Sequence, residues 1–109
     1  MKTIFQDEDL KISESDLDYG FQEFLFETNE SIYNISLDDI VGVSINRKVY
    51  NEGRSYREVV ALDVKHLSTP FYIYFEYGRG PIDDTTVFSD AVVIVFSFFK
   101  EKVLHKNIF

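Results

Sequence analysis

The sequence predicts an α+β fold in which one curved antiparallel sheet, of about five or six strands, packs against a single C-terminal helix. Three observations lead to this class. From residue 20 onward, apolar and polar residues alternate with period two, which is typical of strands that bury one face. Turn-forming residues divide this stretch into short segments. After residue 81 the apolar spacing becomes that of a helix. We expect residues 1–109 to form a single domain, because the chain is too short for two cores.

The first predicted hairpin is centred on Asn29 and Glu30. This centre pairs Phe26 with Tyr33 and Phe24 with Ile35, so that large apolar side chains share one face. Residues 10–13 are predicted to add a short edge strand before the hairpin. The acidic pair at residues 38–39 is predicted to form a bend or tight turn after it.

The second predicted hairpin turns around Glu52 and Gly53. Its alternation places valine, leucine and isoleucine side chains together on one face of the sheet. The expected cross-strand pairs are Ile45 with Val60, Val43 with Leu62, and Val41 with Val64.

The third predicted hairpin has Pro70 at the start of its second strand, where a missing N–H group is tolerated. A loop centred on Ser68 and Thr69 pairs Val64 with Ile73, Leu62 with Phe75, and Val60 with Tyr77. Both hairpins therefore bury the same face of the shared strand, and a one-residue slip in either would invert that face. The other face is expected to be mostly solvated: Ser44, Asn46, Lys48, Arg57, Val59, Ala61, Asp63, Lys65, Tyr72, Tyr74 and Glu76.

Residues 86–104 are predicted to form the helix, since their apolar side chains gather on one arc and their charged side chains fall opposite. Asp83 or Asp84 can serve as the N-cap. A buried strand is the alternative, because residues 91–96 are rich in β-branched side chains. The separation of charges by face favours the helix. Lys102 falls inside the apolar arc and must extend toward solvent, whereas three apolar residues lie outside it: Val93, Ile94 and Leu104.

The net charge of −8 is concentrated in the N-terminal part of the chain. Residues 1–45 contain two lysines and eleven acidic residues, whereas residues 46–109 contain nine basic and eight acidic residues. Such a surface repels nucleic acid and anionic membranes and attracts basic partners. The longest apolar run, residues 91–99, is about half of the roughly 20 residues needed to cross a bilayer. We therefore expect a cytoplasmic protein that binds neither nucleic acid nor membrane.

No residue pattern in the chain predicts catalysis. His66 alternates onto the apolar face near Phe71, where a structural role is expected, and His105 lies at the end of the helix. Cysteine is absent, no Gly-x-Ser-x-Gly stretch occurs, and residues 78–81 lack the pattern of a phosphate-binding loop. The acidic residues 7–9 and 83–84 lack the spacing of a calcium loop. We expect a protein that is not an enzyme and holds no metal or cofactor.

Residues 35–43 (ISLDDIVGV) lead into a hairpin with a basic tip. Strands in this order, followed by one C-terminal helix, resemble bacterial pleckstrin-homology-like domains, and the resemblance implies binding rather than catalysis. This gives an alternative function, a lipid- or peptide-binding module, although Glu52 and Glu58 interleave with the basic residues. Its anion-binding residues are Arg47, Lys48, Arg54 and Arg57.

A small, acidic, cysteine-free domain without a catalytic set also resembles the immunity proteins of bacterial contact-dependent growth inhibition. The resemblance implies an inhibitor that binds a basic toxin domain, such as a nuclease, and occludes its active site. Acidic groups speed the encounter with such a partner, and tyrosines add contact area at low entropic cost. The predicted partner-binding residues are Asp7, Glu8, Asp9, Glu14, Asp16, Asp18, Glu23, Glu27, Tyr72, Tyr74 and Glu76. A third hypothesis is a homo-oligomeric structural subunit, such as a homodimer, assembled through Val93 and Ile94 or through a sheet edge.

Overall fold

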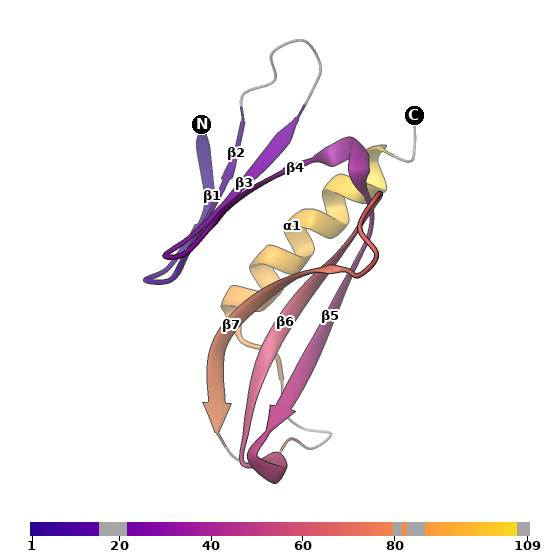
Figure 1. Ribbon diagram of the computed structural model, residues 1–109. Coiled ribbons are helices and arrows are strands. Elements are labelled where there is room, and N and C mark those ends of the chain that lie inside the picture. Colours follow the sequence, from indigo (N-terminus) through magenta and orange to yellow (C-terminus); the bar gives the residue numbers. More distant parts are fainter. Residues whose placement is uncertain (16–21, 80–81, 83–86, 107–109) are drawn as a thin grey trace.

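A computed structural model describes residues 1–15, 22–79, 82 and 87–106 (Figure 1). The described strands form two antiparallel sheets, which are followed by one helix. The α+β class is therefore confirmed, and the expectation of a single sheet is wrong. The elements are β1 (Lys2–Gln6), β2 (Leu10–Glu14), β3 (Glu23–Thr28), β4 (Ile32–Ser36), η1 (Leu37–Asp39), β5 (Ile40–Tyr50), η2 (Asn51–Gly53), β6 (Ser55–Val64), β7 (Phe71–Arg79) and α1 (Asp90–Lys106). The first sheet has the order β1-β2-β3-β4 and the second has the order β5-β6-β7.

The two sheets separate at η1, the short 3-10 helix between β4 and β5. The predicted bend at residues 38–39 lies here and is confirmed. A 3-10 turn redirects the chain without pairing the strands on either side, so β5 pairs with β6 and not with β4. The strand predicted at residues 10–13 is β2, but it is not an edge strand, because β1 pairs with its outer side. Sequence alternation did not reveal β1.

The registers of two hairpins follow the sequence closely. The pairs Phe26–Tyr33 and Phe24–Ile35 are confirmed in the β3–β4 hairpin, as are Ile45–Val60 and Val43–Leu62 in the β5–β6 hairpin. The expected pairing of Val41 with Val64 is wrong. A register shift between Ile40 and Gly42 places Ile40 opposite Val64. As a result Ile40 is fully buried and Val41 is 53% exposed.

The register of the β6–β7 hairpin differs from the prediction by four residues. Val60 pairs with Ile73 and Leu62 with Phe71. The turn lies closer to β6 than expected: the N–H group of Leu67 donates to the carbonyl oxygen of Val64 at 3.2 Å. Because four is an even number, residues 71–75 keep the predicted faces despite the shift.

Two single-residue expectations at the ends of this hairpin are also wrong. His66 is exposed in the turn with a φ of 75°, and it does not lie on the apolar face. Tyr77 pairs with Arg57 and not with Val60. The four-residue shift of the hairpin accounts for most of this difference, and a further register shift between Arg57 and Val59 moves the partner by one residue.

His66→Gly is expected to raise the free energy of unfolding by about 0.5–1 kcal/mol, because glycine adopts a positive φ without the steric cost borne by histidine. Urea denaturation of both proteins measures the change. Leu67→Gly is the matched control, since Leu67 is the neighbouring exposed turn residue and has no positive φ. It should lower stability, and a similar loss for His66→Gly would contradict the turn geometry.

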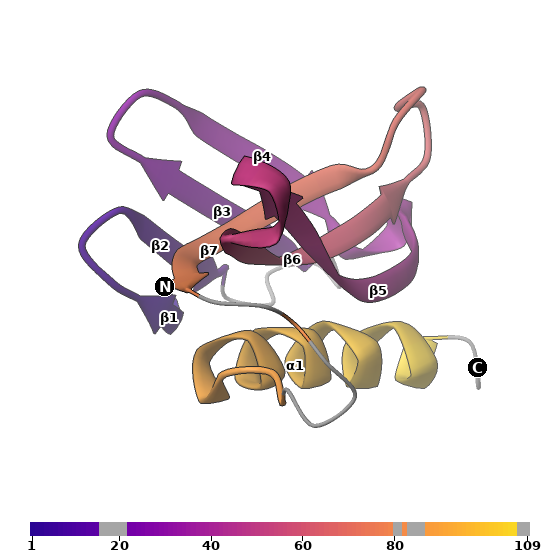
Figure 2. The ribbon, with the colours of Figure 1, turned by 90° about the horizontal axis from the view of Figure 1, so that it is seen from below.

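Both sheets and α1 contribute to one hydrophobic core. Figure 2 shows α1 lying along one side of the molecule, with the strands of both sheets on the other side. Phe99 of α1 has its ring centroid 4.9 Å from that of Phe24 and 5.9 Å from that of Phe26. The buried residues of the core are Ile12, Phe24, Phe26, Ile35, Ile40, Val60, Leu62, Ile73, Phe75, Val92, Val95, Phe99 and Val103.

The outer face of β6 is less exposed to solvent than the sequence predicted. Val59 and Ala61 are only 4% and 3% exposed, although their alternation placed them on the solvated face. β6 is the central strand of its sheet, and these small residues pair with Tyr74 and Tyr72 of β7. Small side chains between larger cross-strand neighbours lose contact with water even on an outer face.

α1 begins at Asp90 and ends at Lys106, so it starts four residues later and ends two residues later than predicted. Both proposed N-caps, Asp83 and Asp84, lie outside the described residues. Val93, Ile94 and Leu104 are exposed as expected. Lys102 lies 3.4 Å from a carboxylate oxygen of Glu14, which gives its ammonium group a partner.

Lys106 joins the end of α1 to η1. Its ammonium group donates to the carbonyl oxygens of Leu37 and Asp38 at 2.8 and 3.2 Å. The pKa of Lys106 is held below its usual 10.5, mainly by partial burial of the ammonium group and secondly by the positive charge of the nearby Lys65. The helix is thus fixed at the point where the two sheets separate.

Candidate functional site

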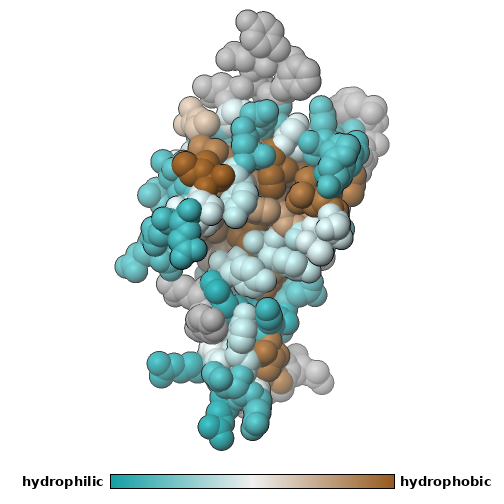
Figure 3. All heavy atoms as spheres, viewed as in Figure 1, coloured by the Kyte–Doolittle hydropathy of each residue, from teal (hydrophilic) through white to brown (hydrophobic). Residues whose placement is uncertain are grey.

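A groove of about 780 Å³ lies between the hairpin tips of the first sheet and strand β7 of the second. We call it the β7 groove. Figure 3 shows hydrophobic atoms at the centre of this face of the molecule, between paler and hydrophilic residues. The groove is lined by Asp9, Leu10, Phe26, Thr28, Asn29, Glu30, Tyr33, Arg57, Tyr72, Ile73 and Tyr74, and by residues 67–71.

Acidic residues form the rim of the groove on the side of the first sheet. The β1–β2 turn exposes Asp7, Glu8 and Asp9, and a carboxylate oxygen of Asp7 accepts the N–H groups of Asp9 and Leu10, each at 2.8 Å. Pairing of β2 with β3 brings this turn to the same end of the sheet as the β3–β4 tip (Figure 1). Glu30 is exposed on that second tip. Acidic residues more than twenty positions apart thus form one negative rim.

Exposed tyrosines of β7 form the opposite wall. Tyr72 and Tyr74 are 46% and 37% exposed, and their ring centroids are 6.0 Å apart. The guanidinium carbon of Arg57 lies 5.0 Å from the ring centroid of Tyr74, and its Nε donates to the carbonyl oxygen of Phe75 at 2.7 Å. These contacts hold Tyr74 against the sheet, so little rotamer freedom remains for a partner to remove on binding.

Tyr33 completes the aromatic lining from the first sheet. It is 47% exposed, and its ring centroid lies 5.3 Å from that of Phe71. Phe71 also contacts Phe26, with 5.0 Å between the centroids. Sequence reasoning placed neither Tyr33 nor Glu30 in the site, although the correctly registered β3–β4 hairpin already put both near its tip.

The other predicted partner-binding residues lie elsewhere. Glu14 faces Lys102 of α1, and Glu23 accepts a hydrogen bond from Asn34 at 3.0 Å, towards the other end of the first sheet. Glu27 pairs with Lys11 along β2 and β3. Of the predicted residues, the structure therefore brings together Asp9 and the two tyrosines around the groove. Asp7 and Glu8 are exposed in the same turn as Asp9 but do not line the groove. Three predicted residues lie outside the described part of the chain: Asp16, Asp18 and the side chain of Glu76.

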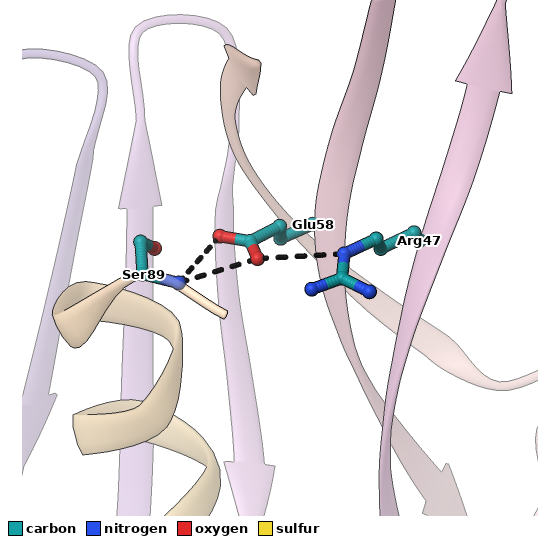
Figure 4. Close-up of polar contacts among 3 residues, drawn as sticks. All are labelled: Arg47, Glu58 and Ser89. Atoms are coloured by element: carbon teal, nitrogen blue, oxygen red, sulfur yellow. Dashed lines mark hydrogen bonds and ion pairs between the residues drawn. The ribbon is translucent and has the colours of Figure 1, made fainter. Parts of the chain in front are cut away.

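The four basic residues of the alternative site do not form one cluster. Nε of Arg47 lies 3.8 Å from a carboxylate oxygen of Glu58 on the inner face (Figure 4), and its guanidinium carbon lies 3.9 Å from the ring centroid of Phe88. Lys48 is the next residue along β5 and points to the opposite face. Arg57 contacts Tyr74, and Arg54 is exposed beyond η2.

Glu58, which the sequence indicated only as an acid among the basic residues of the hairpin, is buried. It is 5% exposed, and its two carboxylate oxygens lie 3.0 and 3.2 Å from the N–H group of Ser89 (Figure 4). Ser89 immediately precedes α1, so the carboxylate lies at the positive end of the helix dipole. This contact positions the start of α1 on the second sheet.

In the described part of the chain, no group of three or more histidine, cysteine or acidic residues is placed to hold a metal ion. Within the same residues, no helix is long and apolar enough to cross a membrane. His105 lies 3.6 Å from Glu101 on α1, whereas His66 lies in the β6–β7 turn. No protein-family model, curated protein or solved structure matches the chain.

Proposed function

We propose that the protein is a non-enzymatic inhibitor that binds a basic protein domain, as an immunity protein neutralises a toxin. One observation carries the proposal: an acidic rim and exposed tyrosines surround the same groove. The rim comes from Asp9 and Glu30, and the opposite wall from Tyr72 and Tyr74. Residues far apart in the sequence thus supply charge and contact area at one place.

The two kinds of residue have different physical roles in such a complex. Exposed acidic groups attract a basic partner over distances of about one Debye length, roughly 8–10 Å, and increase the association rate. Tyrosines held at one wall supply apolar contact with few rotatable bonds, which slows dissociation. A partner whose basic active site faced the groove would be blocked without any chemistry by the inhibitor.

The lipid- or peptide-binding alternative has less support. An anionic headgroup needs several cations that converge, whereas Arg47 faces Glu58 and Phe88 on the inner side of the sheet. Sedimentation with liposomes containing anionic lipid separates the two hypotheses, because the inhibitor proposal expects no binding. A homodimer through Val93 and Ile94 is tested by light scattering, which would report twice the mass of the 12.8 kDa chain.

Reversing the charge of Asp7, Glu8 and Asp9 to lysine is expected to slow association with the partner by roughly tenfold or more at low salt. The partner to test is the product of the neighbouring gene, and surface plasmon resonance gives the rate constants. Salt should reduce the difference between the variant and the unmodified protein, because mobile ions screen exposed charges.

The matched control reverses three exposed acids outside the groove, Asp38, Asp63 and Glu101, and changes the net charge by the same amount. Its association rate should stay closer to that of the unmodified protein. If both variants lost the same amount of association rate, the cause would be the net charge of the protein and not the position of the acidic residues at the rim. The absence of any complex, together with no protection of cells from the neighbouring gene product, would overturn the proposed function.

A further inference from the structure

The lining of the β7 groove shows that it runs along the open edge of a strand. Successive side chains of a strand point to opposite faces, so a hollow over one face is lined by alternate residues. The β7 groove is lined by consecutive residues from Pro70 to Tyr74. Both the inward Phe71 and Ile73 and the outward Tyr72 and Tyr74 therefore border it, as expected where a groove follows the edge.

This edge lacks the usual protection against pairing. In the described part of the chain β7 pairs only with β6, so its other side presents backbone N–H and C=O groups. Residues 71–75 contain no charged residue and no proline. Natural edge strands are commonly blunted by lysine, proline or a covering element. Pro70 precedes the strand and leaves the following residues able to pair.

We propose that the edge of β7 from Phe71 to Tyr74 binds an extended, lysine- or arginine-containing segment of a partner protein as an added strand. Backbone hydrogen bonds to β7 supply sequence-independent affinity. Basic side chains of the segment reach Asp9 and Glu30 on the rim and lie over the ring of Tyr72. The inference rests on the proposed function for the basic character of the partner.

Charge favours a basic segment over a second copy of this chain as the occupant. Edge-to-edge pairing of two copies would bring together two chains that each carry a net charge of −8. It would also bring the exposed acidic tips of the two chains close together at the groove. Residues 71–75 of the second chain contain no basic side chain that could balance this negative charge. A basic segment meets the same rim with the opposite charge.

The first test uses three labelled synthetic peptides with blocked ends. One alternates lysine and valine over seven residues, the second has the same sequence with alternate backbone nitrogens methylated, and the third replaces lysine with glutamate. Fluorescence anisotropy is expected to show binding of the first, at least roughly tenfold weaker binding of the second, and no measurable binding of the third. Equal binding of the first two peptides would overturn strand addition, as would the absence of binding by the first.

Hydrogen exchange locates the bound peptide. The lysine–valine peptide should slow the exchange of backbone amides among residues 71–74, because strand addition gives N–H groups on the open side of β7 a new acceptor. Slowing confined to the helix or to β5 would overturn the assignment of this edge.

A variant pair then separates the edge from the proposed function. Tyr74→Lys adds a charge to the groove, and Ile94→Lys adds the same charge at an exposed position on α1. Tyr74→Lys should weaken binding of the peptide and of the whole partner by roughly tenfold, whereas Ile94→Lys should preserve both. If Tyr74→Lys weakened neither, the edge proposal would fail while inhibition of the partner still stood. Sedimentation that showed a dimer of the free chain, abolished by Tyr74→Lys, would overturn the choice of occupant.

Discussion

Phe99→Ala is expected to lower the free energy of unfolding by about 3–5 kcal/mol, a large part of the stability of a domain of this size. Phe99 is fully buried, and its ring contacts Phe24 and Phe26 of the first sheet and Phe98 of its own helix. Removing it leaves a cavity where the helix meets the first sheet. Thermal and urea denaturation followed by circular dichroism measure the loss.

Ile94→Ala is the matched control for Phe99→Ala. Ile94 lies on the same helix but is 56% exposed, so its truncation should change stability by about 0.5 kcal/mol or less. Similar losses for the two variants would contradict the packing of α1 against the first sheet.

Glu58→Ala is expected to cost about 3 kcal/mol of stability, because it removes the carboxylate partner of Arg47 and the acceptor for the N–H group of Ser89. Glu58→Gln should cost less, since the amide oxygen still accepts a hydrogen bond. Urea denaturation compares both variants with Glu52→Ala, which removes an exposed acid from the hairpin tip and should be nearly neutral.

A double-mutant cycle tests whether Glu58 and Arg47 act together. Arg47→Met removes the cation while keeping much of the side-chain volume, and Glu58→Ala in that background should cost less than in the unmodified protein. The difference is expected to exceed about 0.5 kcal/mol. Additive losses would mean that Glu58 acts only on the start of the helix.

Alternation in the sequence predicted pairing well wherever a short turn joined two regular strands. The β3–β4 hairpin and the middle of β5–β6 have the expected registers because tight turns fix the pairing and apolar alternation fixes the face. The β6–β7 register was wrong because the turn lies closer to β6 than predicted and includes an exposed His66 with positive φ, which few non-glycine residues adopt. A single sequence gives little warning of such a residue.

The candidate site was predicted only in part. The sequence pointed to acids and to two tyrosines, and the structure places Asp9, Tyr72 and Tyr74 around one groove. It places Glu14 and Glu23 elsewhere, facing Lys102 and Asn34. Counting charges along the chain does not distinguish acids at the groove from acids that contact α1 or a neighbouring strand, because strand pairing and helix packing decide the neighbours of each carboxylate.

The sequence by itself determined the α+β class, the inward face of the regular parts of β3 to β7 and the apolar face of the helix. These features depend on the periodicity of apolar residues within a short segment, which can be recognised from that segment alone. Only the tertiary structure decided that η1 divides the strands into two sheets and that the acidic tips face β7 across a groove. Both outcomes depend on contacts between distant segments, chiefly the shared core in which α1 packs against both sheets.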